Sequence, residues 1–588
     1  MVTNSSDKSY LSKVIFGNGS SYHDPAICIL SDEFIFAEGL ERHTQCKRAV
    51  TSSLSYSNRA ILKAFSDQRV FTDKDTKVTC INSWDPTKVS TEVLDAENFP
   101  ITASLMTITH AMAPLVNVQM SGVLSRSAFK ARTLKAKDLD KKNIAHHLAH
   151  AANAALTSPF EDCVVMIIDG HSECDSSTFF HFKEGKFRPL HEPNSKRGEA
   201  DPIKHYLASP GITYAEVTLL CGFEPEKGEE WKVMGLAAYG SYRPDIYEFF
   251  IEHSSIDGLE LRFNIFDQGA RKRLSQLVGG FRSADDADVL KSADLAHNFQ
   301  LAFERRLIEV TTKLGALGLS KNLAFAGGCA LNSSANGKLL NGTGFSRLHV
   351  PSAPADDGNA LGAALYEKYI IQKAKRVPKV FTPYLGSFPN FEALERILSL
   401  GGAKYIRAKD DADLCDKVSD FLCQGKIIGW MQGRAEYGPR ALGNRSIIGD
   451  PRPSHMKDLI NERVKFREEY RPLAPSILHE FGEEYFESYA ESPYMERALV
   501  FKEAVRNKVP AVVHKDGTGR LQTVKEEWNP LYYKLILKFY EKTGIPLILN
   551  TSFNVMGKPI IHSVEDAITV FSTSGLDVLV MGDFIITK

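Results

Sequence analysis

The chain of 588 residues carries 71 basic and 72 acidic side chains, and 43% of its residues are hydrophobic. This composition excludes a largely disordered chain, and at about 100–200 residues per domain the length predicts several domain-sized units. The net charge of −1 gives no general attraction to nucleic acid or anionic lipid, and we find no local basic patch. We therefore expect neither nucleic acid nor a membrane as a partner.

The first dozen residues lack the basic start and the apolar stretch of a signal peptide, and no window approaches the ~20 apolar residues of a membrane span. A cytoplasmic protein is the expectation. The nine cysteines are scattered and contain no CxxC pair, which predicts reduced, mostly buried thiols without a zinc knuckle or a disulfide framework.

The N-terminal pattern predicts a meander of three short strands. From Lys13 the chain reads VIFGN, then GSSYHDPAICIL, then a polar turn and FIFAEGLER. We expect the first turn to hold small or polar groups whose backbone can approach a phosphate or a metal-bound ligand. These residues are Gly17, Asn18, Gly19, Ser20, His23 and Asp24.

From about Lys135 the sequence AKDLDKKNIAHHLAHAANAAL predicts a helix on which His146 and His150 share one face. The apolar run CVVMIIDGHSE follows and is typical of a strand covered on both faces. It ends in Asp169, Gly170, His171 and Glu173, and polar groups at the carboxyl end of such a strand usually face a cleft.

Two later segments place glycines between a strand and a helix. LAFAGGCALNSSANGKL contains Gly327 and Gly328, and VPSAPADDGNALGAAL contains Asp356, Asp357 and Gly358. Helix starts preceded by glycines are anion sites. The basic, proline-bearing stretch 372–389 loses the apolar period and is the predicted linker.

Two imidazoles one helical turn apart can bind one metal ion. With a distant carboxylate they resemble the two-His, one-carboxylate set that suits Fe(II), whereas the Glu of a metalloprotease motif is absent after His146. The alternative is a pair of histidines that cap a core or donate to carbonyls, and the spacing alone leaves the two interpretations equal.

The last third of the chain contains a set of basic residues within apolar sequence. Guanidinium groups bind planar or tetrahedral oxyanions through paired hydrogen bonds, so this set indicates an anion site. Surface salt bridges with Glu468 and Glu469 are the alternative, mainly for the members nearest to them. The set consists of Arg434, Arg440, Arg445, Lys465, Arg467, Arg471 and Arg520.

Weaker candidates are Glu230 and Lys232 in EEWKVMGLAAYG, and Asn550 and Asn554 after an apolar strand. A solvated helix start and ordinary turn residues explain them equally well. No Walker A loop, Rossmann GxGxxG or nucleophile elbow is present, which argues against NAD chemistry and a nucleophilic serine.

Taken together, these segments resemble the O-carbamoyltransferase family of nodulation-factor, aminoglycoside and cephalosporin carbamoyltransferases. The resemblance runs in the family order from about residue 14 to 585. It rests on YHDPA, HHLAHAANA, DGHSE, EWKVMGLAAYG, AGGCALNS, DDGNALGAAL, GRAEYGPRALGNRSIIGDPR, KFREEYRPLAPS, HKDGTGRLQTV and NTSFNVMGKPI.

The resemblance implies an α/β protein with a duplicated actin-like domain of the sugar-kinase and heat-shock-chaperone superfamily over residues 1–375. A YrdC-like domain over 376–588 is implied to follow. It further implies that the second domain forms carbamoyl adenylate from carbamoyl phosphate and ATP, with Mg²⁺ as a possible companion of ATP. The first domain then passes the carbamoyl group to a hydroxyl of a small-molecule acceptor and releases AMP. A homodimer is also expected from the family.

Carried over from the family, His146, His150 and Asp357 match the ligands of a metal expected to be iron or another divalent ion, although Asp356 is an adjacent alternative. Lys465, Arg467 and Arg471 match the carbamoyl phosphate motif. Other nucleotide and phosphate contacts are expected from the remaining matches, which are Gly327, Gly328, Asn332, Glu230, Lys232, Arg434, Arg440, Asn444, Arg445, Ser446, Arg520, Asn550 and Asn554.

The transfer step needs a general base for the acceptor hydroxyl. Asp24, Asp169 and His171 are candidates beside His23, which we favour. One departure from the family pattern is His43, which replaces an aromatic residue. We expect residues 45–130 and 175–225, which match no motif, to shape the acceptor pocket.

Two alternatives remain. A tRNA threonylcarbamoyl-transfer enzyme resembles both halves, but the near-neutral charge without a basic stripe argues against an RNA surface. A non-catalytic ATP-binding protein of the actin-like superfamily would not need the second arginine cluster. A sugar kinase is weaker still, because it leaves the last third of the chain without a role.

Overall fold

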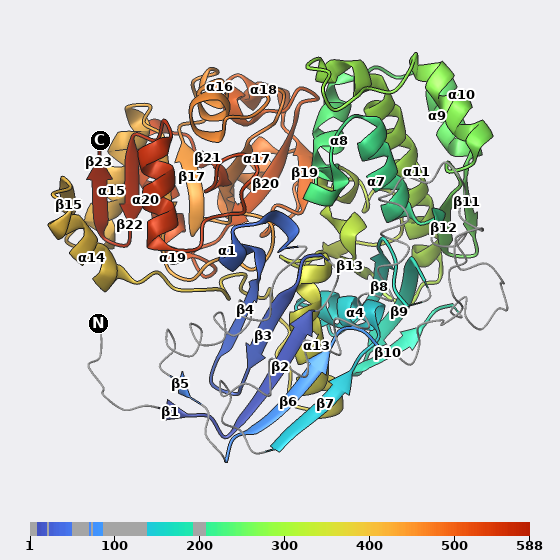
Figure 1. Ribbon diagram of the computed structural model, residues 1–588, viewed down its shortest axis with the longest axis horizontal. Coiled ribbons are helices and arrows are strands. Elements are labelled where there is room, and N and C mark those ends of the chain that lie inside the picture. The colour runs from blue at the N-terminus through green and yellow to red at the C-terminus, as the bar shows by residue number, and fades with distance from the viewer. Residues whose placement is uncertain are drawn as a thin grey trace.

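The computed structural model describes residues 9–19, 23–49, 70–71, 75–85, 138–173, 175–191 and 207–588. Three larger sheets with helices between and around them make up this part. In Figure 1 the first sheet, drawn in blue, lies below the C-terminal part, which is drawn in orange to red. Ser20, most of 45–130 and part of 175–225 lie outside the described residues.

The first sheet has five strands in the order β4-β3-β2-β6-β7. The first three strands form the predicted antiparallel meander, and β6 and β7 add in parallel beside β2. The strands are β2 (Lys13–Gly19), β3 (Ala26–Leu30), β4 (Ile35–Gly39), β6 (Lys77–Asn82) and β7 (Asp138–Asn143).

The prediction of a helix that starts near Lys135 was wrong for the first part of that segment. Asp138–Asn143 forms β7, which pairs with β6 along its whole length, and helix α4 begins only at His146 and ends at Leu156. The segment that becomes β7 is mostly charged, so the sheet pairing outweighs its weak local preference. The part of the prediction that places His146 and His150 on one helix is confirmed.

Gly17 and Gly19 lie inside strand β2, so they are not part of the predicted phosphate-facing turn. A Cβ atom on Gly17 would come within 1.9 Å of the carbonyl oxygen of Ala360. The first residues of α13 (Asn359–Tyr366) therefore lie directly on this strand. These glycines serve close packing of a helix on the sheet rather than the approach of a ligand.

The second sheet repeats the arrangement of the first. Its order is β10-β9-β8-β13-β14, with an antiparallel meander of three strands followed by two parallel additions. This repetition confirms the predicted α/β class with a duplicated N-terminal half. The strands are β8 (Asp162–Ile168), β9 (Ser177–Lys183), β10 (Lys186–Pro189), β13 (Asn322–Ala326) and β14 (Arg347–His349).

Helices α4 and α13 pack tightly against each other between the two sheets. Both are rich in alanine, and a Cβ atom on Gly362 would come within 2.0 Å of the carbonyl oxygen of Ala149. Helix α4 leaves the first sheet after β7 but packs on β8 and β13 of the second. Helix α13 leaves the second sheet after β14 but packs on β2 and β3 of the first.

The C-terminal part contains a nine-stranded mixed sheet with its own hydrophobic core. Helices α15 (Asp411–Cys423) and α19 (Pro530–Thr543) pack against each other in this part. In spatial order the strands are β15 (Tyr405–Arg407), β23 (Phe584–Thr587), β22 (Val578–Met581), β16 (Ile428–Met431), β17 (Arg445–Gly449), β21 (Leu547–Ser552), β18 (Ala474–Leu478), β20 (Thr518–Val524) and β19 (Arg497–Val500).

Residues 372–390 contain no helix or strand, as the predicted linker requires. Within this segment, Arg376 donates hydrogen bonds to the carbonyls of Ala155 (3.0 Å), Leu156 (3.1 Å) and Phe160 (2.7 Å) around the end of α4. A guanidinium at a helix C-terminus satisfies carbonyls that lack intrahelical partners. The linker is therefore tied to the N-terminal part, and the domain boundary at 375/376 stays a prediction.

The cysteines in the described ranges are free thiols, and most of them are buried. No helix in the described part of the chain combines the length and the hydropathy that crossing a bilayer requires.

Candidate active site

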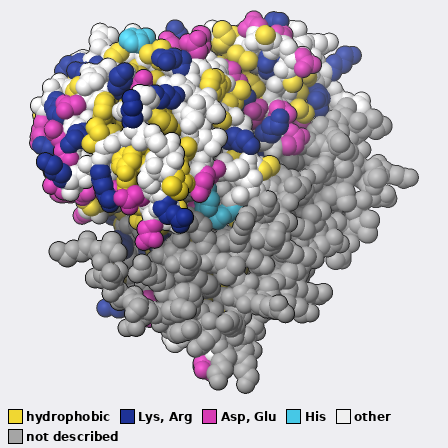
Figure 2. Space-filling model, turned by 60° about the vertical axis from the view of Figure 1, so that its left-hand side comes forward, with side chains coloured by type: hydrophobic (Ala, Val, Ile, Leu, Met, Phe, Trp, Pro, Cys, Tyr) yellow, Lys and Arg dark blue, Asp and Glu magenta, His cyan; other side chains and the backbone are white. Residues whose placement is uncertain are grey.

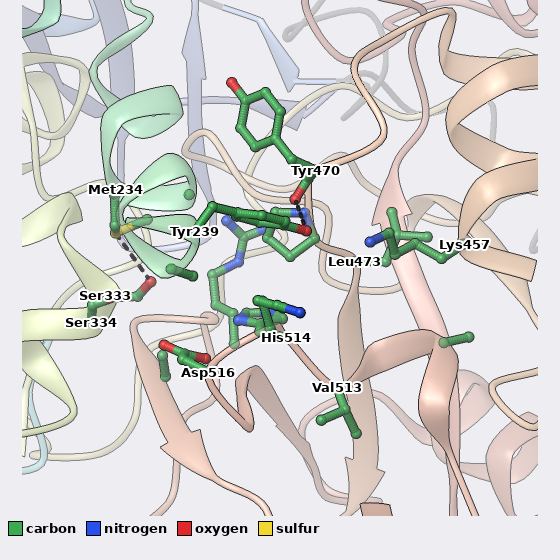
Figure 3. Close-up of a pocket in the computed structure, with 17 residues that line it drawn as sticks. Met234, Tyr239, Ser333, Ser334, Lys457, Tyr470, Leu473, Val513, His514 and Asp516 are labelled. Carbon is green, nitrogen blue, oxygen red and sulfur yellow. Dashed lines mark hydrogen bonds between the residues drawn. The ribbon is translucent and has the colours of Figure 1, made fainter. Parts of the chain in front are cut away.

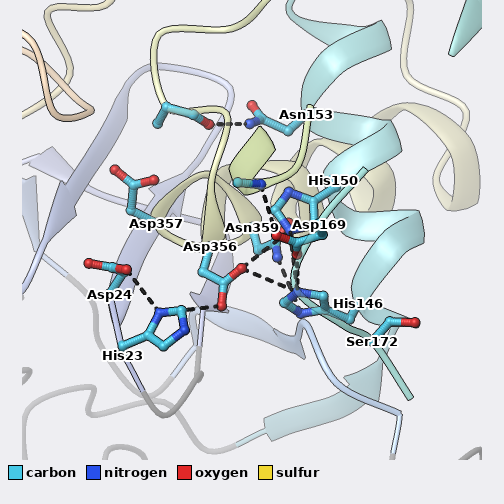
Figure 4. Close-up of polar contacts among 12 residues, drawn as sticks. His23, Asp24, His146, His150, Asn153, Asp169, Ser172, Asp356, Asp357 and Asn359 are labelled. Carbon is cyan, nitrogen blue, oxygen red and sulfur yellow. Dashed lines mark hydrogen bonds and ion pairs between the residues drawn. The ribbon is translucent and has the colours of Figure 1, made fainter. Parts of the chain in front are cut away.

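Four buried side chains meet between the two N-terminal sheets (Figure 4). His146 and His150 lie on α4, Asp169 follows β8, and Asp356 stands three residues before α13. The Nε2 atoms of the two histidines are 3.2 Å apart. Each lies 3.2–3.3 Å from Oδ2 of Asp169 and 3.3 Å from Oδ1 of Asp356.

These separations fit a divalent ion held by all four groups. Around an ion with bonds of about 2.0 Å, tetrahedrally arranged ligand atoms are about 3.3 Å apart. Two imidazoles and two carboxylates are a donor set for Fe(II), Zn²⁺ or a similar ion. The two carboxylate charges would also offset the charge of the ion in this buried place.

The contacts around His146 support the same conclusion. Asn359 Nδ2 lies 3.3 Å from His146 Nδ1, while Asn359 Oδ1 is buried without a hydrogen-bond partner among the described residues. A 180° rotation of this amide exchanges its nitrogen and oxygen, so that Oδ1 accepts a hydrogen bond from Nδ1–H. This leaves Nε2 unprotonated and ready to bind an ion.

A carboxylate takes the place of an N-cap at the start of α4. Ala145 has no side chain that can cap the helix, and the backbone N–H of His146 instead donates to Oε1 of Glu173 at 2.9 Å. The same oxygen accepts the backbone N–H of Asp85 at 2.9 Å. Glu173 therefore fixes the first turn of the helix that carries both histidines.

Asp169 connects the four-residue group to the glycine loop after β13. Its Oδ1 accepts the backbone N–H of Gly328 at 2.8 Å while its Oδ2 faces the imidazoles. Burial raises the pKa of Asp169, but the hydrogen bonds and charges of His146 and His150 outweigh burial and hold it well below its ordinary value. The sequence predicts Asp169 as a candidate base, and the structure places it among the candidate ligands.

Of the predicted ligands His146, His150 and Asp357, the structure brings the two histidines together with Asp356, whereas Asp357 does not face the imidazoles (Figure 4). The carboxyl of Asp357 lies on the side of Asp24, and its Oδ1 is buried without a hydrogen-bond partner in the described ranges. Burial, together with repulsion from Asp24, Glu41 and Asp356, raises the pKa of Asp357 to about 8.

His23 lies at the edge of the four-residue group. Its Nδ1 is 2.9 Å from Oδ2 of Asp24 and 3.9 Å from Oδ2 of Asp356 (Figure 4). Asp24, which has a positive φ of 55°, also accepts a hydrogen bond from Arg48 Nε at 3.1 Å. The carboxylate of Asp24 therefore orients both a potential base and a guanidinium beside the candidate ion.

His171, another predicted base, belongs to a row of rings next to the same group. Its ring centroid lies 5.9 Å from that of Trp84, and Trp84 lies 4.4 Å from the ring of His146. Trp84 is buried. The row covers one side of the candidate ion site with aromatic surface.

The glycine loop makes contacts within the protein. Gly327 has a φ of +94°, and a Cβ atom there would come within 2.3 Å of the carbonyl oxygen of Ile168, so only glycine fits. The amide of Asn332 exchanges two hydrogen bonds of 3.0 Å with that of Gln300. Asn332 is thus held by a neighbouring amide rather than directed at an open site.

Five basic side chains of the C-terminal part lie within electrostatic reach of one another. Burial, and repulsion from neighbouring guanidinium groups, lower the pKa of Lys465 and of Arg520 well below their ordinary values. Burial also lowers the pKa of Arg467 to about 9 and that of Arg440 to about 10, and the pKa of Arg471 is lowered as well. A bound anion would remove this repulsion.

Some of these side chains are anchored and others are free. Lys465 Nζ donates to Oδ1 of Asn554 at 2.5 Å and to Oγ of Ser552 at 3.1 Å. Arg467 Nε donates to Asn461 at 2.7 Å. In contrast, the guanidinium groups of Arg440 and Arg520 have no hydrogen-bond or ion-pair partner in the described part of the chain, and Nε of Arg520 is buried.

Arg434 and Arg445, two predicted nucleotide contacts, hold backbone carbonyls in this structure. Arg434 donates to the carbonyl of Ile35 at 2.7 Å and so ties the C-terminal part to β4. Arg445 is fully buried, which closes its guanidinium to a ligand in this structure. It donates to the carbonyl oxygens of Gln432, Gly433, Asn444 and Ser387 at 2.5–3.1 Å.

Three further predicted nucleotide contacts are also engaged within the C-terminal core. Asn444 Nδ2 donates to the carbonyl of Arg434 at 2.8 Å, and Ser446 Oγ accepts the N–H of Gly443 at 3.1 Å. Asn550 Nδ2 donates to Oε1 of Gln522 at 3.0 Å. These contacts are all made within the C-terminal part.

Helix α8 (Glu230–Leu236) connects the basic cluster to the N-terminal part. The guanidinium of Arg471 stacks 3.8 Å from the ring centroid of Trp231, and Lys47 lies 5.8 Å from the same ring. Lys232 bridges to Glu468 at 3.2 Å, and Glu230 lies 3.7 Å from Arg48. Glu230 and Lys232, two predicted cofactor contacts, therefore lie at this junction.

A cavity opens between the same two parts (Figure 3). Tyr239 and Ser333 line it from the N-terminal part, and Tyr470, His514 and Arg520 line it from the C-terminal part. The hydroxyl of Tyr239 donates to the carbonyl of Tyr470 at 3.3 Å across the junction. The unpaired guanidinium of Arg520 thus has access to a space that both parts enclose.

Family models match most of the chain. The model described as "Carbamoyltransferase N-terminus" matches residues 15–365, and that described as "Carbamoyltransferase C-terminus" matches residues 419–588. A solved structure of full-length HypF covers 64% of this chain and 48% of its own, with 13% identity and a TM-score of 0.38.

Curated relatives include nodulation proteins of rhizobia. NolNO of Sinorhizobium fredii is 37% identical over 76% of this chain, and the alignment spans 64% of NolNO itself. NolO of Bradyrhizobium diazoefficiens is 36% identical over 75% of this chain and 78% of its own length. Nodulation protein U of Sinorhizobium fredii is 28% identical over 93% of this chain and 94% of its own length.

Proposed function

Because this chain belongs to the carbamoyltransferase family of enzymes, we propose that it carries out two coupled reactions at two sites. The C-terminal part converts carbamoyl phosphate, ATP and one water into carbamoyl adenylate, phosphate and pyrophosphate. The N-terminal part transfers the carbamoyl group to the hydroxyl oxygen of a small-molecule acceptor, the acceptor loses its proton, and AMP leaves.

The basic cluster is suited to the first reaction. Carbamoyl phosphate and ATP are both highly anionic, and Lys465, Arg467 and Arg471 gather positive charge at one place. The free guanidinium groups of Arg440 and Arg520 provide further positive charge. An anion in this place stabilises the charged form of every member of the cluster. The charged side chains in turn favour binding of the anion.

The four-residue group is suited to the second reaction. His146, His150, Asp169 and Asp356 would hold a divalent ion, which can polarise a carbonyl or stabilise a leaving phosphate oxygen. His23 lies next to this group, and Asp24 holds its ring through Nδ1. We assign His23 as the base that takes the proton of the acceptor hydroxyl, since its ring lies beside Asp356 of the candidate ion site.

A mixed anhydride such as carbamoyl adenylate hydrolyses readily in water, so the two sites need a protected connection. The contacts of α8 support such a connection. From Arg471 they lead through Trp231 to the neighbouring Glu230, and from there through Arg48 to Asp24. The intermediate would pass between two parts of the chain that are already in contact along this line.

The observation that carries this proposal is the pairing of a four-ligand ion site with a buried basic cluster in one chain of this family. The test is carbamoyl phosphate-dependent exchange between ATP and pyrophosphate, which needs no acceptor. We expect exchange with the wild-type chain and at least a 100-fold loss in Arg467→Ala. Arg305→Ala, which removes an exposed arginine paired with Glu309, is the matched control and should retain exchange.

Other outcomes of this experiment would contradict the proposal. Exchange that requires threonine and bicarbonate instead of carbamoyl phosphate would favour threonylcarbamoyl transfer, which would also call for tRNA binding. Basic and acidic side chains are mixed over the described part of the face in Figure 2, which supports a small-molecule acceptor over RNA. ATP binding without any exchange would favour a non-catalytic nucleotide-binding protein.

A further inference from the structure

A second group of two imidazoles and a carboxylate lies where the first sheet meets the C-terminal part. Glu38 is on β4, His43 is on α1 (Glu41–Thr44), and His562 lies two residues before α20 (Val564–Thr573). One donor atom of each lies within 4.8 Å of the others. The function proposed above uses none of these three side chains.

The two histidines face different oxygens of the same carboxylate. His43 Nε2 lies 2.8 Å from Oε2 of Glu38, and His562 Nδ1 lies 3.8 Å from Oε1. The ring centroids of the two histidines are 4.2 Å apart. A nitrogen–oxygen distance of 3.8 Å exceeds that of a hydrogen bond, but two ligands on one ion with bonds of about 2.1 Å reach this separation at a wide angle.

The carboxylate of Glu38 is held in place from its other side. Ser387 of the linker donates its hydroxyl to Oε2 at 2.6 Å and its backbone N–H to Oε1 at 3.1 Å. Hydrogen bonds of this kind orient the carboxylate ligands of metal sites. Both oxygens keep lone pairs for a further partner, since a carboxylate accepts about four bonds in total.

The charge of this group needs a counterpart. Glu38 is only 1% exposed, and within the described residues its ion pairs are those with His43 and His562. A buried carboxylate is strongly destabilising unless a positive charge accompanies it. A divalent cation between the three side chains would supply this charge and use both imidazoles as ligands.

We propose that Glu38, His43 and His562 form a second divalent-cation site, separate from the group at His146, which ties the N-terminal part to the C-terminal part. Two imidazole nitrogens and one carboxylate suit Zn²⁺ or a similar borderline ion, with a remaining position for water. Glu38 and His43 come from the N-terminal part, and His562 comes from the C-terminal part. The neighbouring hydrogen bond from Arg42 Nη2 to the carbonyl of Gly438 (2.8 Å) joins the same two parts.

The experiment uses Co²⁺ as a visible probe and the full chain. His146→Gln combined with His150→Gln removes the first group, so that any remaining tight site is the one proposed. We expect this double variant to bind one Co²⁺ per chain with the visible absorption of imidazole-bound cobalt. Adding His562→Gln should abolish that absorption, whereas adding the exposed His455→Gln should leave it unchanged.

A second measurement separates ligand loss from misfolding. Zn²⁺ should raise the melting temperature of the double variant but not that of the triple variant with His562→Gln, and both should show the same circular dichroism without metal. The proposal is wrong if the double variant binds no Co²⁺, or if the triple variant binds it as well as the double variant does. Neither result depends on carbamoyl transfer.

Discussion

Asp356 and Asp357 are neighbours in the chain, yet only Asp356 places its carboxylate between the imidazoles of His146 and His150 (Figure 4). We therefore expect Asp356→Asn to lower the affinity for a divalent ion by at least 10-fold, because it removes a charged ligand. Asp357→Asn is the matched control and should retain the ion. Metal content per chain after dialysis against a buffered ion measures both. Equal loss in the two variants would contradict the assignment.

Trp231 packs between the basic side chains of two parts of the molecule, and its removal should uncouple the two sites. In Trp231→Ala we expect carbamoyl phosphate-dependent ATP–pyrophosphate exchange to stay within about threefold of wild type, because no member of the basic cluster is changed. Release of AMP without a carbamoylated product should rise, because the intermediate escapes to water. Trp231→Phe keeps an aromatic ring for Arg471 and should behave like wild type. Equal loss of both activities in Trp231→Ala would argue against a connecting role.

His349 should contribute to acid sensitivity. Burial and the charges of Arg376 and Arg497 lower the pKa of His349 to about 3, whereas an unfolded imidazole titrates near 6.5. Between these values the unfolded chain binds a proton that the folded chain does not. The contribution of this pKa shift to the free energy of unfolding is therefore fully present above pH 6.5 and is lost as the pH falls toward 3. The total change is on the order of 3–5 kcal/mol.

The measurement is the melting temperature of wild type and His349→Gln at pH 7.5 and pH 5.0. Glutamine can keep the contact that His349 Nε2 makes with Thr157 Oγ1 at 3.0 Å. The fall in melting temperature between the two pH values should be smaller in the variant, because its side chain does not titrate. An identical fall in both proteins would show that His349 does not carry this dependence.

The close approach of α13 to β2 predicts a sharp difference between two glycines. In Gly17→Ala the new Cβ atom would come within 1.9 Å of the carbonyl of Ala360, so helix and strand must separate, at a cost of about 1–3 kcal/mol or more. In the control Gly39→Ala the nearest atom is the Cγ of Glu41 at 3.9 Å. Denaturant unfolding should show a much larger loss of stability for the first variant than for the second.

Local patterns in the sequence were sufficient for the main elements of the site. The meander from Lys13, the buried strand that delivers Asp169, and the helical pair His146 and His150 all follow from hydrophobic period and short spacing. Period and spacing also placed Asp356 at a helix start. Hydrophobic period and short spacing are signals within a single helix or strand, and the structure contains the elements that they predict.

The features of the site that have no local signal depend on contacts between distant segments. The choice of Asp356 over Asp357 depends on how the turn before α13 meets α4, and the roles of Arg434 and Arg445 depend on carbonyls supplied by other segments. The sequence marks His43 only as a departure from the family pattern, because its neighbour His562 is more than 500 residues away along the chain. A single sequence contains no local signal for such pairs.

The exchange of helices α4 and α13 between the two N-terminal sheets has a mechanical consequence. The histidines are carried by a helix packed on the second sheet, and Asp356 immediately precedes a helix packed on the first. Separating the two sheets would move the carboxylate of Asp356 away from the imidazoles. A bound ion would therefore hold the two sheets together at this point.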